Sequence, residues 1–399
     1  MNLQPRVEQL GTESAFAVLA RAKELEESGR HVVGLEIGEP DFSTRPHIVE
    51  AAVEALRAGA THYVPAPGTP QLRRAVSAFL ERTGRMQVAP ERVIVTPGAK
   101  PIMFFTILAL CGPGDEVLFP DPGFPMYESI TAFAGAMPVP VPLRESNQFR
   151  IDPDELESLI TDRTRLLVVN SPHNPCGSVL TKGDCEAIAE TCLRHDLTVL
   201  SDEVYWAIRY DAERASVLDV DGMAERTILL DGWSKTFAMT GWRLGFGVFP
   251  PKLVEPITRL VVNSVSCTSA FSQVAAQAGL EGPWQPVEEM VTEFRRRRDV
   301  VVEGLNAMSG VTCVQPQGAF YAFPNVSSFG LTSAELQRRL LDEASMACVA
   351  GSAFGKWGEG YLRLSYAASV EDLHLALSAM GQYLDALATE LPIRPLAGA

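Results

Sequence analysis

One lysine at the end of a predicted strand has the surroundings that best suit covalent chemistry. Lys235 lies in the segment TILLDGWSKTFAMTGWRLGFG (227–247), between an apolar run and a turn that contains glycines. Trp233 and Phe237 flank it. An amine that is partly removed from water there has a lowered pKa, and a neutral amine is what forms an imine with a carbonyl group. A solvated lysine in a surface loop is the alternative that this segment leaves open.

Groups that suit a bound cofactor also follow four other predicted strands. They are the loop Gly98, Ala99 and Lys100, the aromatic Phe124, the amide Asn174, and the carboxylate and phenol of Asp202 and Tyr205. A loop of small residues before a helix is an anion site, because backbone N–H groups are free at a helix N-terminus. Each single position also has a structural alternative: a turn residue for Asn174, a helix cap for Asp202 and a core residue for Phe124.

Taken together, these strand ends predict one ligand. In an open sheet of parallel strands, ligands bind beyond the carboxyl ends, so the groups are expected around one cleft. They supply an amine, a carboxylate, a phenol, an amide, an aromatic face and an anion-binding loop. A flat cofactor with a phosphate and an aldehyde uses every one of them, and pyridoxal 5′-phosphate fits. The protein would orient this cofactor, which carries the difficult chemistry.

The elements that must position these residues alternate along the chain from about residue 90. Strands are predicted at Arg92–Thr96, Glu116–Phe119, Met137–Val141, Arg165–Asn170, Thr198–Ser201, Thr227–Leu230 and Arg243–Phe249. Helices are predicted at Pro101–Cys111, Met126–Ala134, Lys182–His195 and Pro251–Val262. Apolar strands with helices between them indicate an α/β fold, with a mostly parallel seven-stranded sheet that helices cover on both faces.

The two ends of the chain are expected to form a second, smaller domain beside the cleft. Residues 13–30 read as one amphipathic helix closed by Gly29, and strands are expected near Gly318–Phe323 and Tyr361–Ser365. The prediction is a large cofactor-binding domain at 46–284 and a smaller α+β domain built from 1–45 and 285–399.

Composition excludes several classes of partner. The 399 residues carry a formal charge of −15 and the sequence pI is about 5.0, which argues against nucleic acid or an anionic membrane. The run Arg295–Arg298 is the local exception, and a solvated helix face is the favoured interpretation. The apolar run 101–112 is too short to span a bilayer.

The N-terminus lacks the apolar core of a signal peptide. The seven cysteines form no CxxC pair, so free thiols in the cytoplasm are expected. The six histidines do not cluster with them, so no metal site is predicted.

Several segments, in order and over nearly the whole chain, resemble one family. They are GEPDFSTRP (38–46), HYVPAPGTPQLR (62–73), VTPGAK (95–100), NSPHNPCG (170–177), SDEVY (201–205), WSKTFAMTGWRLG (233–245) and RLSYA (363–367). The chain is similar to the class I/II aminotransferases of fold type I, which depend on pyridoxal phosphate, and within them to the bacterial subgroup related to aspartate aminotransferase. The resemblance implies a ping-pong transfer of an amino group between an L-amino acid and a 2-oxo acid.

The resemblance also implies a role for each residue around the cofactor. Lys235 would hold the cofactor as a Schiff base and move the proton, and Asp202 would pair with the protonated ring nitrogen. Asn174 and Tyr205 would hydrogen-bond the ring oxygen, and Phe124 would stack on the ring. The phosphate would bind Arg243 and the backbone of Gly98, Ala99 and Lys100.

On the substrate side, Arg363 would bind the α-carboxylate as a two-pronged donor, with Gly38 and Asn174 beside it. Tyr63 would reach the cofactor phosphate of a neighbouring subunit, which makes a homodimer with shared active sites the expected assembly. An exposed aromatic in a proline-rich loop is the alternative for Tyr63.

Some positions depart from the family pattern or leave a choice open. Gly232 stands where many relatives have a hydroxyl residue that contacts the phosphate, and Asp231 stands where close relatives often have asparagine. Lys100 matches a lysine that reads the distal carboxylate of an acidic substrate in some relatives, but balancing the phosphate charge is the favoured role. Aspartate or glutamate is therefore one possible substrate among several.

Other reactions need the same cofactor residues, because the carbanion can break different bonds. A lyase is the alternative activity, with Arg363 and Lys235 favouring transamination. The effector domain of a transcription regulator is a different class. It would need a DNA-binding segment before the small domain, which residues 1–40 are too short to supply.

Overall fold

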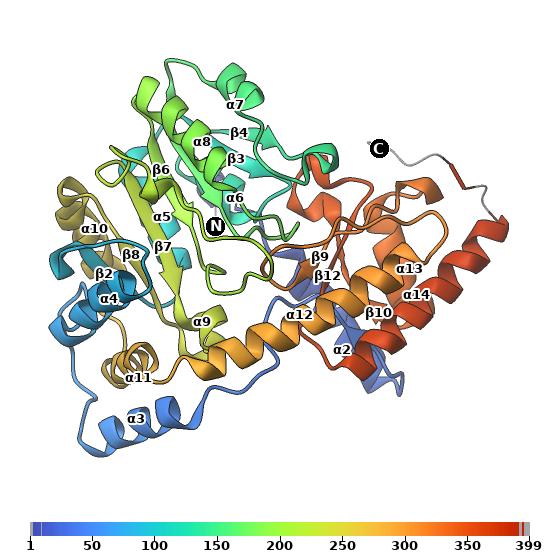
Figure 1. Cartoon of the computed structure of the whole chain (residues 1–399), viewed down its shortest axis with the longest axis horizontal. Helices are drawn as coiled ribbons and strands as arrows, with labels where there is room; N and C mark the ends of the chain where they lie inside the picture. The colour runs from blue at the N-terminus through green and yellow to red at the C-terminus, as the bar shows by residue number, and fades with distance from the viewer. Residues whose placement is uncertain (1–2, 9, 391–392, 395–399) are drawn as a thin grey trace.

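A seven-stranded sheet forms the centre of the larger part of the protein (Figure 1). The computed structural model describes residues 3–8, 10–390 and 393–394. The strand order is β2-β8-β7-β6-β5-β3-β4. The strands are β2 (Val93–Thr96), β3 (Glu116–Asp121), β4 (Met137–Pro142), β5 (Thr164–Asn170), β6 (Thr198–Asp202), β7 (Thr227–Gly232) and β8 (Gly245–Val248). The predicted mostly parallel α/β sheet is confirmed, and β8 is the strand that runs antiparallel to both neighbours.

Two predicted strands begin too early, by one residue at Arg92 and by two residues at Arg243. Arg243 is not part of β8, because its φ of 54° lies in the left-handed region, and the strand starts at Gly245. The direction of β8 has a consequence for the site. Because β8 is antiparallel to β7, the residues just before it lie at the edge where the parallel strands end.

Alternate residues of the central strands pack against opposite layers, as the two-residue period of a strand requires. In β7, Leu229 packs into a cluster with helices α3, α4 and α11. Its neighbours Ile228 and Leu230 pack with α5, α6 and α10 on the other face. The helices are α3 (Pro46–Arg57), α4 (Pro70–Arg82), α5 (Lys100–Leu110), α6 (Met126–Phe133), α7 (Pro153–Leu159), α8 (Lys182–Arg194), α10 (Pro251–Ser264) and α11 (Ala270–Glu281). The four helices predicted between 101 and 262 match within two residues at each end, whereas the helix predicted at 13–30 ends three residues earlier, at Glu27.

The two ends of the chain meet in the smaller part, where blue and red segments lie together in Figure 1. Val33–Gly34 (β1) pairs in parallel with Met346–Ala347 (β10). A second sheet has the order β11-β12-β9. Its strands are β9 (Tyr321–Ala322), β11 (Val349–Ala350) and β12 (Leu362–Ser365). The helices here are α2 (Ser14–Glu27), α12 (Gln285–Asn306), α13 (Ser333–Ala344) and α14 (Val370–Glu390), while the short α1 (Pro5–Glu8) contacts α6.

Helix α12 links the two parts, and Figure 1 shows it crossing from one to the other. Its Val287 packs into a cluster of the large sheet, whereas its Leu305 packs into the core of the smaller part. The boundary between 284 and 285 therefore stays a prediction, and the predicted small-domain segments also extend into residues outside the described ranges.

The basic run of α12 confirms half of the sequence interpretation and corrects the other half. Arg295 and Arg296 are exposed, as expected, whereas Arg297 and Arg298 are buried. Arg297 pairs with Asp41 at 2.7 Å, and Arg298 pairs with Asp211 at 2.8 Å. A buried arginine needs such a partner, because removing its charge from water is costly. Within the described ranges, no helix combines the length and apolar character needed to cross a membrane.

Candidate active site

A cavity of about 500 Å³ opens at the edge of the sheet where the parallel strands end. Ten of the residues predicted for the site line it: Gly38, Ala99, Lys100, Phe124, Asn174, Asp202, Tyr205, Lys235, Arg243 and Arg363. Gly98 lies just outside this set, behind Arg243. Tyr63 is 90% exposed and does not line the cavity. The segments 1–45 and 285–399 thus contribute Gly38 and Arg363 to a site whose other predicted residues come from the large sheet.

Lys235 lies in a short helix, α9 (Trp233–Thr236), directly after β7. Its side chain is half-buried, and its Nζ donates a hydrogen bond to the carbonyl oxygen of Gly38 at 2.5 Å. Burial lowers the pKa of the amine to about 8, with Glu39 acting in the opposite direction. More of the amine is therefore neutral near pH 7 than for a solvated lysine, and the surface-loop alternative is wrong.

Asp202 ends β6 with its carboxylate buried. The hydroxyl of Tyr127 donates to its Oδ2 at 2.8 Å, and the backbone N–H of Val204 donates to Oδ1 at 3.3 Å. Burial raises the pKa of Asp202 to about 7, although the Tyr127 hydrogen bond lowers it. A cation placed against this carboxylate would stabilise its charged form, which is what a protonated ring nitrogen supplies.

Arg363 lies on β12 with its guanidinium in the cavity wall. Its Nη1 donates to Oδ1 of Asn174 at 3.3 Å, and its Nη2 donates to the carbonyl oxygen of Glu36. Its buried Nε has no hydrogen-bond partner. The guanidinium lies 4.7 Å from the centre of the Tyr321 ring, which fixes its plane. An arginine held in this way can bind a planar carboxylate with two parallel hydrogen bonds.

Two glycines make room in the site. A Cβ at Gly38 would lie 2.1 Å from the hydroxyl of Tyr321. Gly98 has a φ of 88°, and a Cβ there would lie 2.1 Å from Nη2 of Arg243. The backbone of the loop before α5 can therefore approach the guanidinium closely. Free N–H groups of a helix N-terminus and an arginine together suit a phosphate group.

Comparisons with known proteins agree with this geometry. Residues 30–380 match the family model described as "Aminotransferase class I and II". The chain belongs to the class I and II aminotransferases. An aspartate aminotransferase of Pyrococcus abyssi is 45% identical over 359 residues, which cover 89% of this chain and 92% of the relative. An aromatic-amino-acid aminotransferase of Thermococcus litoralis is 44% identical, with coverages of 88% and 92%.

Solved structures give the same result. The structure of an aromatic aminotransferase from Pyrococcus horikoshii superimposes with a TM-score of 0.88 at 44% identity, covering 92% of this chain and 99% of the other. This aminotransferase therefore has the expected fold and performs amino-group transfer with pyridoxal phosphate. Membership of the family decides in favour of transamination over the lyase alternative.

The residues of this aminotransferase fit the cofactor. An amine of lowered pKa and a buried carboxylate line the same cavity, and among the described residues no ion pair joins that carboxylate to a cation. At the other end, the small-residue loop leaves space against Arg243 that a side chain at Gly98 would fill. Gly232 has no side chain and so contributes no hydroxyl, and a Cβ there would lie 2.9 Å from the carbonyl oxygen of Leu244. Ser234 lines the cavity instead.

The structure also places residues in the site that sequence reasoning missed. Tyr127, which hydrogen-bonds Asp202, lies in the first turn of the helix that directly follows the Phe124 loop, and that position was a usable signal. Tyr321 shares a hydrogen bond of 2.7 Å with Tyr205, so the phenol assigned to the ring oxygen already has a buried partner. Glu13 forms an ion pair with Lys100. Tyr321 and Glu13 are distant in sequence from their partners, so no local pattern marks them.

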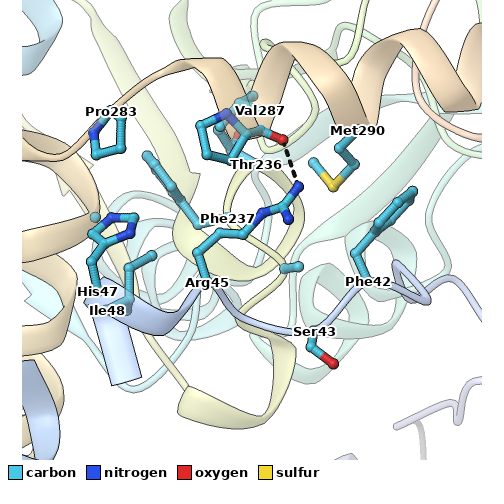
Figure 2. Close-up of a pocket in the computed structure, with 13 residues that line it drawn as sticks. Phe42, Ser43, Arg45, His47, Ile48, Thr236, Phe237, Pro283, Val287 and Met290 are labelled. Atoms are coloured by element: carbon cyan, nitrogen blue, oxygen red, sulfur yellow. Dashed lines mark hydrogen bonds between the residues drawn. The ribbon is translucent and has the colours of Figure 1, made fainter. Parts of the chain in front are cut away.

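A second cavity lies beside residues 236–238, which directly follow Lys235, and Figure 2 shows it. Phe237 reaches into it, and Arg45 donates a hydrogen bond across it to the carbonyl oxygen of Pro286 at 3.2 Å. Its volume of about 20 Å³ is enough for a water molecule but not for an amino acid. Substrate therefore has to enter the large cavity. Among the described residues, no group of three His, Cys, Asp or Glu side chains is arranged to hold a metal ion.

Proposed function

We propose that this aminotransferase uses glutamate and 2-oxoglutarate as one substrate pair, and either aspartate or an aromatic amino acid in the other half-reaction. The observation that carries the proposal is the convergence of Lys235, Asp202 and Arg363 on one cavity. Relatives of comparable identity are named for aspartate in one case and for aromatic amino acids in another. A cavity with cations and aromatic rings supports both kinds of side chain.

The residues have separate tasks in this proposal. Bound pyridoxal phosphate supplies an electron sink for the bond that breaks at the substrate Cα. Arg363 holds the α-carboxylate, which orients the Cα–H bond toward Lys235. The Nζ of Lys235 would take this proton from the substrate Cα and hold it for return, as general acid–base catalysis requires. Asp202 would keep the ring nitrogen of the cofactor protonated, and Arg243 with the Gly98 loop would hold the phosphate.

The half-reaction tests this proposal directly. Holoenzyme is mixed with one amino acid at a time, without any oxo acid, and the visible absorbance is followed. Glutamate is expected to bleach the band of the lysine-linked cofactor and to release one equivalent of 2-oxoglutarate. Release of ammonia with a 2-oxo acid, or loss of the substrate side chain, would contradict transamination, and the ranking of the other amino acids identifies the second substrate.

Arg363→Ala is expected to lower kcat/KM by roughly 10²-fold to 10³-fold, mainly through KM, because the substrate carboxylate loses a two-pronged charged donor. Arg363→Lys restores the charge but not the fork, so an intermediate value is expected. Cofactor content, measured from the absorbance of the phosphate-bearing cofactor released in alkali, should be unchanged in both variants. An unchanged kcat/KM in Arg363→Ala would show that this residue does not bind the α-carboxylate.

A homodimer with shared sites is part of the proposal. Tyr63 is 90% exposed in the single chain. Such exposure is unfavourable for a large aromatic side chain. Contact with the phosphate of a partner subunit would bury it. Sedimentation equilibrium over a range of concentrations measures whether the dimer forms.

All seven cysteines are free thiols in the structure, and the cytoplasmic location stays a prediction.

A further inference from the structure

One cation in the active-site cavity was expected from the sequence to balance the phosphate charge, but its amine is paired with a carboxylate of the chain instead. Arg243, Arg363 and Lys235 are assigned to the phosphate, the α-carboxylate and the transferred proton. Lys100 also lines the cavity, from the first turn of α5, with its side chain 50% exposed. Its Nζ lies 5.5 Å from the centre of the Phe124 ring. This lysine therefore lies where a substrate side chain could reach it.

Lys100 is not a free cation, because Glu13 is paired with it. Glu13 stands directly before helix α2, at the position where a side chain often caps the helix, but it makes no such hydrogen bond. Its carboxylate instead accepts a hydrogen bond from Nζ of Lys100. Eighty-seven residues separate the two, so the contact depends on how the N-terminal segment crosses the mouth of the cavity.

The same segment adds an apolar surface next to this ion pair. Ala15 and Phe16 line the cavity together with Glu13, and Phe16 is 59% exposed. The other carboxylate at the rim, Glu39, accepts a hydrogen bond from Thr240. Glu13 is thus the carboxylate that neutralises Lys100, in a pocket wall that also offers aromatic rings.

We propose that Glu13 determines substrate specificity by competing with the substrate for Lys100. This inference rests on the proposed function, since it concerns the side chain of the amino acid. A distal carboxylate of the substrate can bind Lys100 only after displacing Glu13. An uncharged or aromatic side chain leaves the ion pair in place and meets no unpaired charge, which would be costly to desolvate. One site thereby accepts both acidic and aromatic substrates.

Glu13→Gln in the holoenzyme tests the proposal. The variant is expected to raise kcat/KM for L-aspartate by roughly fivefold, which is the upper range for a partly exposed ion pair. The value for L-phenylalanine should not rise, and should fall by no more than about twofold, because its ring then meets an unpaired Lys100 whose side chain is 50% exposed and stays hydrated. Glu27→Gln, which removes the same charge from the exposed end of α2, is the control and should leave both values unchanged.

A double variant and a binding measurement separate competition from a structural effect. In a Lys100→Met background, Glu13→Gln should no longer favour aspartate, because no cation remains to compete for. Calorimetry on holoenzyme should show roughly fivefold tighter binding of succinate by Glu13→Gln, with no gain in affinity for 3-phenylpropionate. An unchanged succinate affinity would overturn the proposal. A loss of kcat/KM that is confined to L-arginine would also overturn the proposal, because it would mean that Glu13 binds a cationic substrate side chain.

The two proposals can fail independently. If wild-type holoenzyme converts no amino acid in the half-reaction, the proposed function fails. The succinate measurement needs no turnover and still reports whether Glu13 and an added carboxylate compete for Lys100.

Discussion

Lys235→Ala is expected to lower kcat by at least about 10⁴-fold, because the amine that links the cofactor and carries the proton is removed. The wild-type amine has a pKa lowered to about 8 by burial, so it reacts readily with an aldehyde. Purified wild-type protein should be yellow, and the variant should lack the visible band of the linked cofactor. Borohydride reduction followed by peptide mass spectrometry should locate the adduct on Lys235 in the wild type.

The matched control is Lys182→Ala, whose side chain is 87% exposed and lies on α8 away from the cavity. It should keep the colour and the full kcat. A reduced adduct that persists in Lys235→Ala would mean that another amine links the cofactor. A wild-type protein that stays colourless with added pyridoxal phosphate would refute the assignment of the whole site.

The second large effect is expected on stability, at a buried cluster beneath the cofactor residues. Arg85 donates from Nη1 to Asp231 at 2.5 Å and from Nη2 to Glu203 at 2.9 Å. The guanidinium lies 4.4 Å from the centre of the Trp206 ring. Glu203 follows Asp202 directly, and Asp231 lies on β7, so this arginine joins the ends of two strands that carry the site. It also explains why an aspartate stands at 231.

Arg85→Met is expected to lower the free energy of unfolding by about 3–5 kcal/mol, because two buried carboxylates lose their only cation in the cluster. The triple variant Arg85→Met, Glu203→Gln, Asp231→Asn leaves no unpaired charge and should recover much of this loss. Arg259→Met, which breaks an exposed pair with Glu255 on α10, should cost no more than about 0.5 kcal/mol. Urea unfolding of the three variants measures the difference.

The deficit of Arg85→Met should depend on pH. The pKa of Asp231 is already raised to about 6, with burial as the largest cause and Arg85 opposing it. A carboxyl whose folded-state pKa is raised favours the folded state at low pH, and this contribution is lost as the pH rises through that pKa. Without Arg85 the pKa rises further, so the loss extends to higher pH. The deficit should therefore grow from pH 5 to pH 8, and a deficit independent of pH would contradict the cluster's charges as its cause.

Local patterns in the sequence were enough to predict the cofactor end of the site. Lys235, Asp202 and Asn174 each follow an apolar strand, and the carboxyl ends of parallel strands converge whatever the loops between them do. The same logic did not cover Arg243, which precedes its strand. It reaches the same edge because β8 runs the other way, and strand direction is not encoded in an apolar run.

Only the tertiary structure decided the contacts between residues that are far apart in the chain. Arg297 and Arg298 looked like a solvated helix face, but Asp41, Asp211 and the Phe42 ring reach them from other segments. The same holds for Arg85 with Asp231 and for Lys100 with Glu13. Periodicity reports which face of an element is buried, whereas charge pairing depends on which element packs against that face. The sequence alone therefore determined the fold class and the cofactor, because both follow from repeated local patterns. The neighbours that tune the amine, the carboxylates and the substrate pocket were determined by packing.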